Sequence, residues 1–193
     1  MKSKHVCPWW MGYLLASPFR RFGQDPHQIL APHVVEGMTV LEPGPGMGFF
    51  TLELARLVGP KGRVIAIDIQ PKMLIALARH AKKAHLESRV ELRQPEANRM
   101  CADDIQGRVD FVLAFAVVHE LPDAEGFFGE MYHALRPGGR MLLSEPSGHV
   151  NEKNWDQTVL QALTTGFQKH QDLDIRRSRS VMLLKPSTAG AIG

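Results

Sequence analysis

A glycine-rich turn and an acidic residue at the end of a strand are the features of this chain that point most directly to chemistry. Gly44, Gly46 and Gly48 stand at alternate positions between an aliphatic run and a helical pattern. Glycines there let the backbone turn sharply and approach a bound ligand closely. Asp68 closes the next aliphatic run, where a carboxylate can accept both hydroxyls of a ribose. Together these features indicate an adenosine-containing ligand, whereas the glycine turn alone would equally suit a plain tight turn.

The residues around the turn bear on which ligand that is. The dinucleotide fingerprint G-x-G-x-x-G requires glycine at position 49, where this chain has Phe49, and the third glycine comes one residue early at Gly48. Glu42, at the end of the first aliphatic run, would repel a pyrophosphate but suits a cationic amino group. The electrostatics therefore favour S-adenosylmethionine over NAD.

The elements that must position these residues alternate between aliphatic runs and helical patterns, which is typical of an α/β protein with a buried parallel sheet. The expected strands lie at residues 39–41, 64–67, 90–92, 111–118 and 141–143. The helices expected between them span Phe50 to Val58, begin at Pro71, and run from near Asp123 to the Pro-Gly-Gly turn at 137–139. The apolar stripe of the second helix is expected at Leu74, Leu77, Ala78 and Ala81. Residues 151–165 predict a further helix, and residues 167–175 and 180–184 predict an antiparallel strand pair at the sheet edge.

Five segments, in this order, resemble the motifs of the class I S-adenosylmethionine-dependent methyltransferases. They are residues 41–48, Ile67-Asp68, Pro95-Glu96-Ala97, residues 109–113 and residues 135–140. The resemblance is closest over residues 38–145, and it implies a Rossmann-like sheet of seven strands in the order 3-2-1-4-5-7-6 with strand 7 antiparallel. We therefore expect one domain, with residues 1–37 as a helical cap, residues 38–145 as the cofactor-binding core, and residues 146–193 as a helix and strand pair.

The same resemblance implies roles for individual residues. The methionine part of the cofactor would be surrounded by Glu42, Gly44, Pro45, Gly46 and Gly48, and the ribose would be bound by Asp68 with Ile69 beside it. Glu96 and Ala97 would flank the adenine, although the family more often has Gly-Asp where this chain has Pro95-Glu96. Phe115 and Ala116, at the end of the fourth strand, would border the sulfonium.

His119 is the candidate catalytic residue. It lies in a His-Glu-Leu segment after the fourth strand, where many small-molecule members have a similar His-x-Leu. Histidine there could remove a proton from an oxygen or nitrogen nucleophile. The alternative is a histidine that packs and hydrogen-bonds at the end of the strand, and both interpretations stay open at this point.

Composition narrows the function classes. The chain has 193 residues, 44% of them hydrophobic, and its net charge of +3 is too mild to imply a nucleic-acid or membrane partner. Cys7 and Cys101 are too few and too scattered for a disulfide framework, a zinc site or the cysteine-dependent chemistry of arsenite methyltransferases, so a cytoplasmic location is expected. No run approaches the roughly 20 apolar residues of a membrane span, and the apolar run near the N-terminus does not read as a secretion signal.

These observations predict an S-adenosylmethionine-dependent methyltransferase that acts on a small molecule. The segment typical of DNA amino-methyltransferases is missing after the fourth strand, which makes a nucleic-acid acceptor unlikely on sequence grounds. The aromatic cluster of residues 9–22 is expected to be either a lid over the site or a helix buried on the body. A non-catalytic module that binds the cofactor and a nicotinamide-dependent dehydrogenase remain as alternatives.

Overall fold

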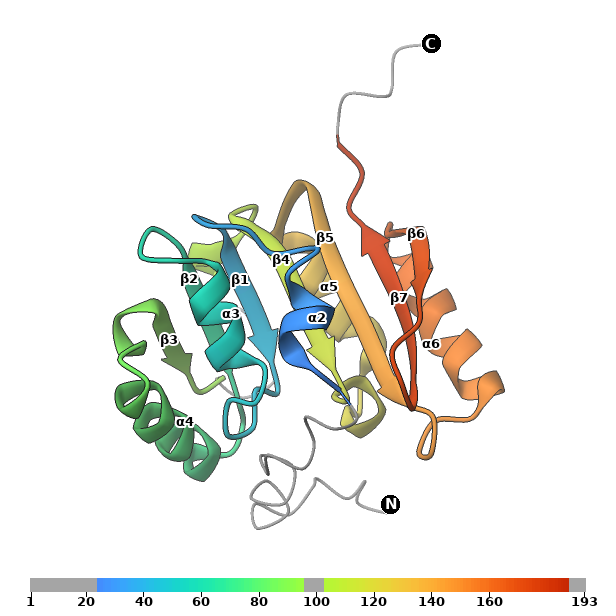
Figure 1. The fold of residues 1–193 in the computed structure, drawn as a ribbon. Helices are drawn as coiled ribbons and strands as arrows, with labels where there is room; N and C mark the ends of the chain where they lie inside the picture. The colour runs from blue at the N-terminus through green and yellow to red at the C-terminus, as the bar shows by residue number, and fades with distance from the viewer. Residues whose placement is uncertain (1–23, 96–102, 188–193) are drawn as a thin grey trace. The chain divides into compact units, whose positions relative to one another are not determined.

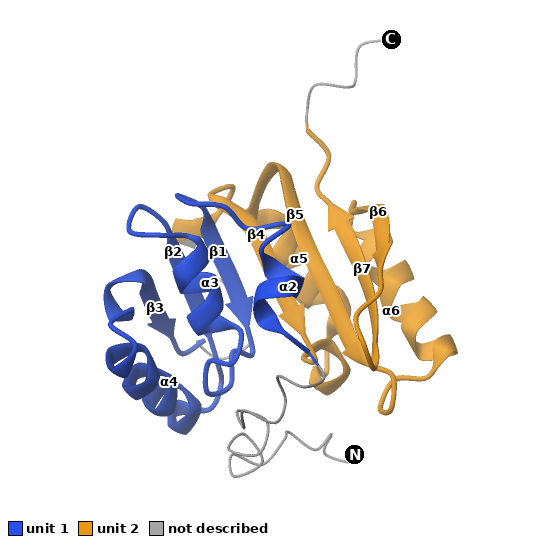
Figure 2. Ribbon diagram, viewed as in Figure 1, with its two compact units in different colours: residues 1–99 blue, residues 100–193 orange. Residues whose placement is uncertain are grey.

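The computed structural model describes residues 24–95 and 103–187. The chain divides into two compact units, residues 1–99 and residues 100–193 (Figure 2). Its strands form a seven-stranded sheet in the order β3-β2-β1-β4-β5-β7-β6, with β7 antiparallel to β5. This topology confirms the α/β fold that the sequence predicted.

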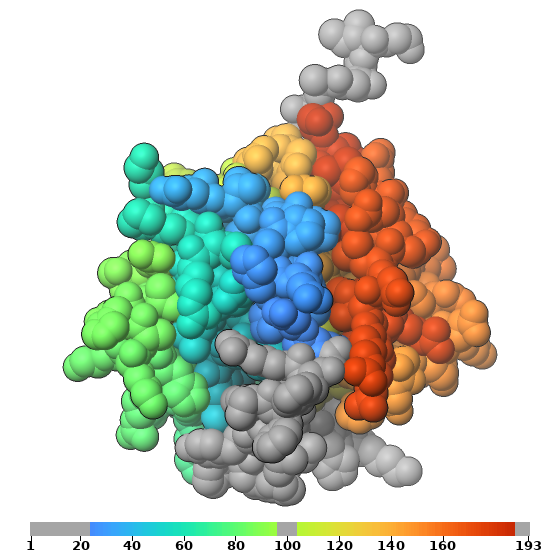
Figure 3. All heavy atoms as spheres, viewed as in Figure 1, coloured from blue at the N-terminus to red at the C-terminus, as the bar shows by residue number. Residues whose placement is uncertain are grey.

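Unit 1 contributes three parallel strands with helices between them (Figure 1). Its elements are α2 (Pro26–Leu30), β1 (Thr39–Pro43), α3 (Thr51–Leu57), β2 (Arg63–Ile67), α4 (Pro71–Lys83), the 3₁₀ turn η2 (Glu87–Arg89) and β3 (Val90–Arg93). In β1 and β2 successive residues such as Val40, Leu41, Val64 and Ile65 are all buried, as expected of strands covered on both faces. Figure 3 shows α2 and α3 side by side on one face of this unit, where they contact each other.

The buried face of α4 differs from the expected one. Leu77 and Ala81 are buried as predicted, but the other two buried positions are Met73 and Ala76, while Leu74 and Ala78 are only half-buried. The most buried stripe of the helix is therefore offset from the expected one. Met73 and Ala76 instead form a cluster with Met47 of the glycine turn, and this contact sets the rotation of the helix.

Unit 2 contributes the other four strands. Its elements are the 3₁₀ turn η3 (Asp103–Ile105), β4 (Val109–Phe115), the 3₁₀ turn η4 (Val118–Glu120), α5 (Ala124–Ala134), β5 (Leu135–Pro146), α6 (Glu152–Thr164), β6 (Gln168–Leu173) and β7 (Ser178–Leu184). α5 begins next to Asp123 as the sequence predicted, and Asp123 caps it, since its Oδ1 accepts a hydrogen bond from the Gly126 N–H at 2.9 Å.

The fourth and fifth strands have different lengths from those expected. β4 ends at Phe115 rather than at residue 118, because Ala116 takes a left-handed conformation with φ of 58° and the chain then turns into η4. β5 extends well beyond residues 141–143, since it pairs in parallel with β4 and antiparallel with β7. The Pro-Gly-Gly segment lies within the bounds of β5, where the pairing with β4 shifts register between Val109 and Phe111.

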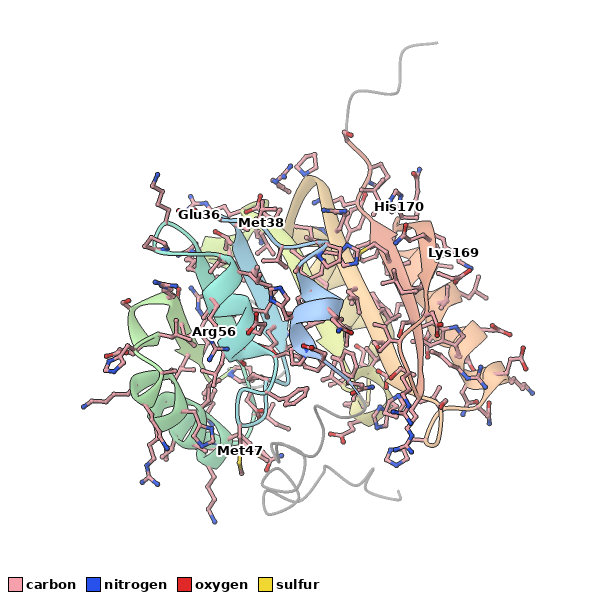
Figure 4. The ribbon with its side chains drawn as sticks, viewed as in Figure 1. Glu36, Met38, Met47, Arg56, Lys169 and His170 are labelled. Atoms are coloured by element: carbon pink, nitrogen blue, oxygen red, sulfur yellow. The ribbon has the colours of Figure 1, made fainter. Side chains whose placement is uncertain are left out.

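The two last strands form the predicted antiparallel pair. β6 is polar and exposed over Gln168 to Asp172, and its register against β7 shifts between Lys169 and Gln171. Lys169 and His170 lie on this outer strand (Figure 4), and Lys169 Nζ is 2.8 Å from Asp172 Oδ1. Within the described residues, every helix is too short or too polar to cross a bilayer.

Candidate functional site

The glycine turn follows β1 directly and is held by backbone hydrogen bonds. The Gly44 N–H donates to Ile67 O at 2.8 Å, and the Gly48 N–H donates to Pro45 O at 3.1 Å. Gly46 and Gly48 have φ of 55° and 94°, values that favour glycine. A Cβ on Gly48 would overlap the Leu77 side chain, whereas a Cβ on Gly46 would meet none of the described residues within 4 Å. The turn is therefore closed on the side of α4 and open at Gly46.

Glu42 is a buried acid at the end of β1, with only 3% of its surface exposed. Burial raises the pKa of Glu42 to about 8; the nearby Thr51 hydroxyl opposes the rise, and the negative charge of Asp68 adds to it. Among the described residues, Glu42 Oε2 and Thr51 Oγ1 are the buried side-chain atoms that lack a hydrogen-bond partner. Buried polar atoms are nearly always paired, so these two atoms beside the glycine turn are suited to a polar or cationic ligand group.

Asp68 lies at the end of β2, where the sequence placed it, and is 8% exposed. Its Oδ1 accepts a hydrogen bond from the Gln70 N–H at 2.8 Å, which fixes the carboxylate at the start of α4. Ile69 follows with 53% of its surface exposed. Unit 1 therefore brings Glu42, the glycine turn and Asp68 to the carboxyl ends of the adjacent strands β1 and β2, the end at which open α/β sheets bind ligands.

Several residues singled out in the sequence lie outside the described residues. They are Glu96 and Ala97, which were expected at the adenine, the aromatic cluster at residues 9–22, and both cysteines. Their assigned roles stay predictions.

In unit 2, β4 ends at two further candidate residues. Phe115 is buried, and the Ala116 N–H donates to Ser144 O of β5 at 2.8 Å. A non-glycine residue at positive φ carries a local strain of about 1–3 kcal/mol, and such residues cluster at functional sites. The conformation of Ala116 directs the chain from β4 into the turn that carries His119.

His119 is paired with a buried carboxylate. Its Nδ1 is hydrogen-bonded to Glu145 Oε2, and the other oxygen of Glu145 accepts a hydrogen bond from the Val118 N–H at 2.8 Å. Glu145 is 1% exposed, whereas the His119 side chain is 23% exposed. A carboxylate only accepts hydrogen bonds, so Nδ1 donates and Nε2 is left as the nitrogen that can bind a further proton.

The surroundings of His119 make it a stronger base. The hydrogen bond to Glu145 raises the pKa of His119 above its ordinary value, burial opposes the rise, and the charge of Glu120 supports it. Glu120 Oε1 is 4.0 Å from Nε2. The His149 ring contacts the His119 ring edge-on, with centroids 5.8 Å apart. This arrangement is suited to accepting a proton and stabilising the resulting imidazolium.

The sequence analysis missed Glu145 and Thr51. Glu145 stands one residue before the end of β5, and an acid in an otherwise apolar strand is a signal that could have identified it. Thr51 is the first residue of α3 and carries no comparable signal in the sequence.

The residues of unit 1 fit S-adenosylmethionine. The unpaired carboxyl oxygen of Glu42 is suited to the cofactor's ammonium group, the open space at Gly46 leaves room for a ligand, and the carboxylate of Asp68 is suited to ribose hydroxyls. A cavity of about 360 Å³ also lies in unit 2 beside α6, with Trp155 and Leu160 in its wall. It contains none of the residues that the sequence singled out for cofactor binding or catalysis.

Comparison with known proteins gives the family. A family model described as a methyltransferase domain matches residues 35–177. An arsenite methyltransferase of Halobacterium salinarum is 36% identical over 109 residues, which cover 56% of this chain and 27% of that protein. A ubiquinone/menaquinone biosynthesis C-methyltransferase, UbiE, of Enterobacter sp. is 31% identical over 62% of this chain and 47% of its own length. This chain thus spans less than half of these curated relatives.

A solved structure matches over a larger share of both chains. The crystal structure of an S-adenosylmethionine-dependent methyltransferase from Aquifex aeolicus has a TM-score of 0.83 and 25% identity, covering 93% of this chain and 100% of the other. The region matched by the family model, residues 35–177, includes β1, the glycine turn, Asp68 and the His119–Glu145 pair. The chain therefore belongs to the methyltransferase-domain family.

Proposed function

We propose that this chain is one methyltransferase domain that transfers the methyl group of S-adenosylmethionine to a small-molecule acceptor, with His119 removing the proton of the acceptor. The observation that carries the catalytic part is the His119–Glu145 pair, in which a buried carboxylate orients an imidazole that is still accessible. Family membership supports the cofactor.

The residues of unit 1 are assigned to cofactor binding. Glu42 and the glycine turn are proposed to hold the methionine part, and Asp68 is proposed to hold the ribose with Ile69 beside it. The unpaired oxygen of Glu42 supports this assignment, because an ammonium group would supply its missing hydrogen bond. When bound, the cofactor would supply a methyl group attached to a sulfonium sulfur. On transfer the methyl–sulfur bond breaks, and the rest of the cofactor leaves as a neutral thioether.

The residues of unit 2 are assigned to the acceptor side. His119 Nε2 accepts the proton of an acceptor hydroxyl, and the oxygen electron pair then forms the new bond to the methyl carbon. Glu145 stabilises the imidazolium through Nδ1 until the proton passes to water. Phe115 and Ala116 are proposed to border the sulfonium, where the buried ring of Phe115 excludes water.

The His119–Glu145 pair supports one class of acceptor. A base is useful for a hydroxyl or another group that arrives protonated, and it adds little for an acceptor that is already an anion. The named relatives are an arsenite methyltransferase and a ubiquinone/menaquinone biosynthesis C-methyltransferase, which supports a small-molecule acceptor. Because this chain has only two cysteines, we favour a hydroxylated organic acceptor over arsenite. The exclusion of nucleic acid and the cytoplasmic location stay predictions.

The test has two steps. First, S-adenosylhomocysteine, NAD(H) and NADP(H) are titrated against the purified chain by calorimetry and thermal shift, and only S-adenosylhomocysteine should bind and stabilise it. Second, transfer of labelled methyl is measured with phenols, quinols, amines, arsenite with thiols, and RNA.

Each outcome has a distinct meaning. Methylation of a hydroxylated small molecule supports the proposal, whereas methylation confined to arsenite or RNA contradicts the acceptor class. Binding of S-adenosylhomocysteine with no transfer to any acceptor would instead favour a cofactor-binding module. A thermal shift with NAD(H) alone would overturn the cofactor assignment.

A further inference from the structure

One face of α4 contacts the glycine turn along its length. Met73 and Ala76 pack against Met47, and Leu77 lies where a Cβ on Gly48 would be. One turn further along the helix, His80 Nδ1 is 2.8 Å from Met47 O. Positions 73, 76, 77 and 80 follow helical spacing, so a single stripe of α4 supports the turn. Figure 4 shows Met47 beside this helix.

The contact with His80 fixes one peptide group. A carbonyl oxygen can only accept, so His80 Nδ1 donates to Met47 O. The N–H of the same peptide group, which belongs to Gly48, donates to Pro45 O at 3.1 Å. Because the peptide group is planar, holding both its oxygen and its hydrogen fixes its orientation, and with it the direction of the chain from Met47 to Gly48.

At Gly46, by contrast, a Cβ would meet no atom of the described residues within 4 Å. The turn is thus supported on the α4 side and accessible at Gly46. The first turn of α4 is also joined to Asp68, whose Oδ1 accepts the Gln70 N–H. One helix therefore contacts both parts of unit 1 that are assigned to the cofactor.

We propose that α4 braces the glycine turn in its ligand-binding conformation and that His80 is a positioning residue for the cofactor, acting through the Met47 carbonyl. This inference rests on the proposed function, because it names a residue that prepares the same cofactor site. Nothing in it requires His80 to touch the ligand.

Two substitutions of similar size separate positioning from helix stability. In His80→Asn the side-chain amide nitrogen can take the place of Nδ1 and donate to Met47 O, whereas in His80→Gln the amide lies one carbon further out. Asparagine is the poorer helix former of the two. If His80 mattered only for helix stability, the Asn variant would be the weaker binder.

Affinity for S-adenosylhomocysteine is measured by calorimetry for the wild type, His80→Asn, His80→Gln and His80→Ala. Arg79→Asn, at an exposed position of the same helix, is the matched control. Losing one hydrogen bond should weaken binding about three- to tenfold in the Gln and Ala variants, while the Asn variant and the control should stay within about twofold of wild type. Methylthioadenosine, which lacks the amino-acid part, should lose less affinity than S-adenosylhomocysteine.

Amide exchange at residues 44–48 is measured on the same proteins without ligand, and it should be faster in the Gln and Ala variants than in the Asn variant. Unchanged affinity and unchanged exchange in the Gln and Ala variants would overturn the brace, as would equal losses for both ligands. If the wild type itself binds no S-adenosylhomocysteine, the proposed function fails, and the exchange rates still decide whether His80 holds the turn.

Discussion

His119 Nδ1 is hydrogen-bonded to Glu145 Oε2, and the N–H of the residue before His119 is bonded to the other oxygen of the same carboxylate. Glu145 therefore holds both the side chain and the backbone of the segment that carries the candidate base. It does so from near the end of β5, where Glu145 pairs with Arg179 of β7. A carboxylate in this position sets the tautomer, the orientation and the basicity of the imidazole together.

Removing the charge of Glu145 should weaken the base without removing it. In Glu145→Gln the pKa of His119 should fall, because the hydrogen bond to the carboxylate is the main reason why this pKa is raised. Turnover should drop by about 10- to 100-fold, and the acid limb of the pH profile should move to lower pH. Glu125→Gln, on the exposed part of α5, is the matched control. A profile identical to that of the wild type would refute the role of Glu145.

Removing the imidazole tests the base directly. With a hydroxyl acceptor, His119→Ala should lower turnover by about 10²- to 10⁴-fold and leave the Kd for S-adenosylhomocysteine within about twofold. Raising the pH should restore part of the activity, since more of the acceptor is then ionised. A parallel loss of cofactor affinity or thermal stability would show instead that His119 is a packing residue.

Asp68 should contribute to cofactor affinity through its negative charge. Asp68→Asn can keep an oxygen that accepts the Gln70 N–H, so the start of α4 is preserved while the charge is lost. Binding of S-adenosylhomocysteine should weaken by about 10- to 100-fold, the range expected for two charge-assisted hydrogen bonds. The comparison is with Glu87→Gln, an exposed acid of η2. Equal affinity in a folded Asp68→Asn protein would show that this carboxylate does not bind the ligand.

The raised pKa of Glu42 predicts how the stability of the ligand-free protein depends on pH. Its pKa is raised from 4.5 to about 8 by burial, so between these values the folded state holds a proton that the unfolded state has released. The contribution of Glu42 to stability is therefore full below pH 4.5 and is lost as the pH rises towards 8.

The check is the melting temperature between pH 5 and 8 for the wild type and Glu42→Gln. The Gln variant should show a flatter dependence and a higher Tm at pH 8, yet it should bind S-adenosylhomocysteine more weakly because the partner of the ammonium group is lost. If both proteins melt with the same pH dependence, Glu42 does not hold a proton in the folded state.

How much the sequence could predict differs between the fold and the site. The strands and helices along the chain were predictable because aliphatic runs and glycine stops act locally, whereas their order in the sheet was implied by the family resemblance. The rotation of α4 was not, because the positions of Met73 and Ala76 depend on a contact with Met47, which is distant in the chain. The end of β4 was not predictable either, because nothing in the sequence around Ala116 indicates that this residue has a positive φ.

At the site, the residues that fit the cofactor were identifiable because Glu42, the glycines and Asp68 stand at fixed distances from strand ends. The partner of His119 was not, because it is 26 residues away and becomes a neighbour only when β4 and β5 pair. His80 was missed for the same reason, being 33 residues from the carbonyl that it contacts.

The edge strand β6 affects how the protein behaves in concentrated solution. A regular, apolar edge strand can recruit the edge of a second chain and start aggregation. β6 instead presents exposed polar side chains, including the charged Lys169, and its register shifts next to His170. An incoming strand would have to bury these groups and match an irregular hydrogen-bond spacing. Edge-to-edge growth at β6 is thus discouraged by side chains and backbone together.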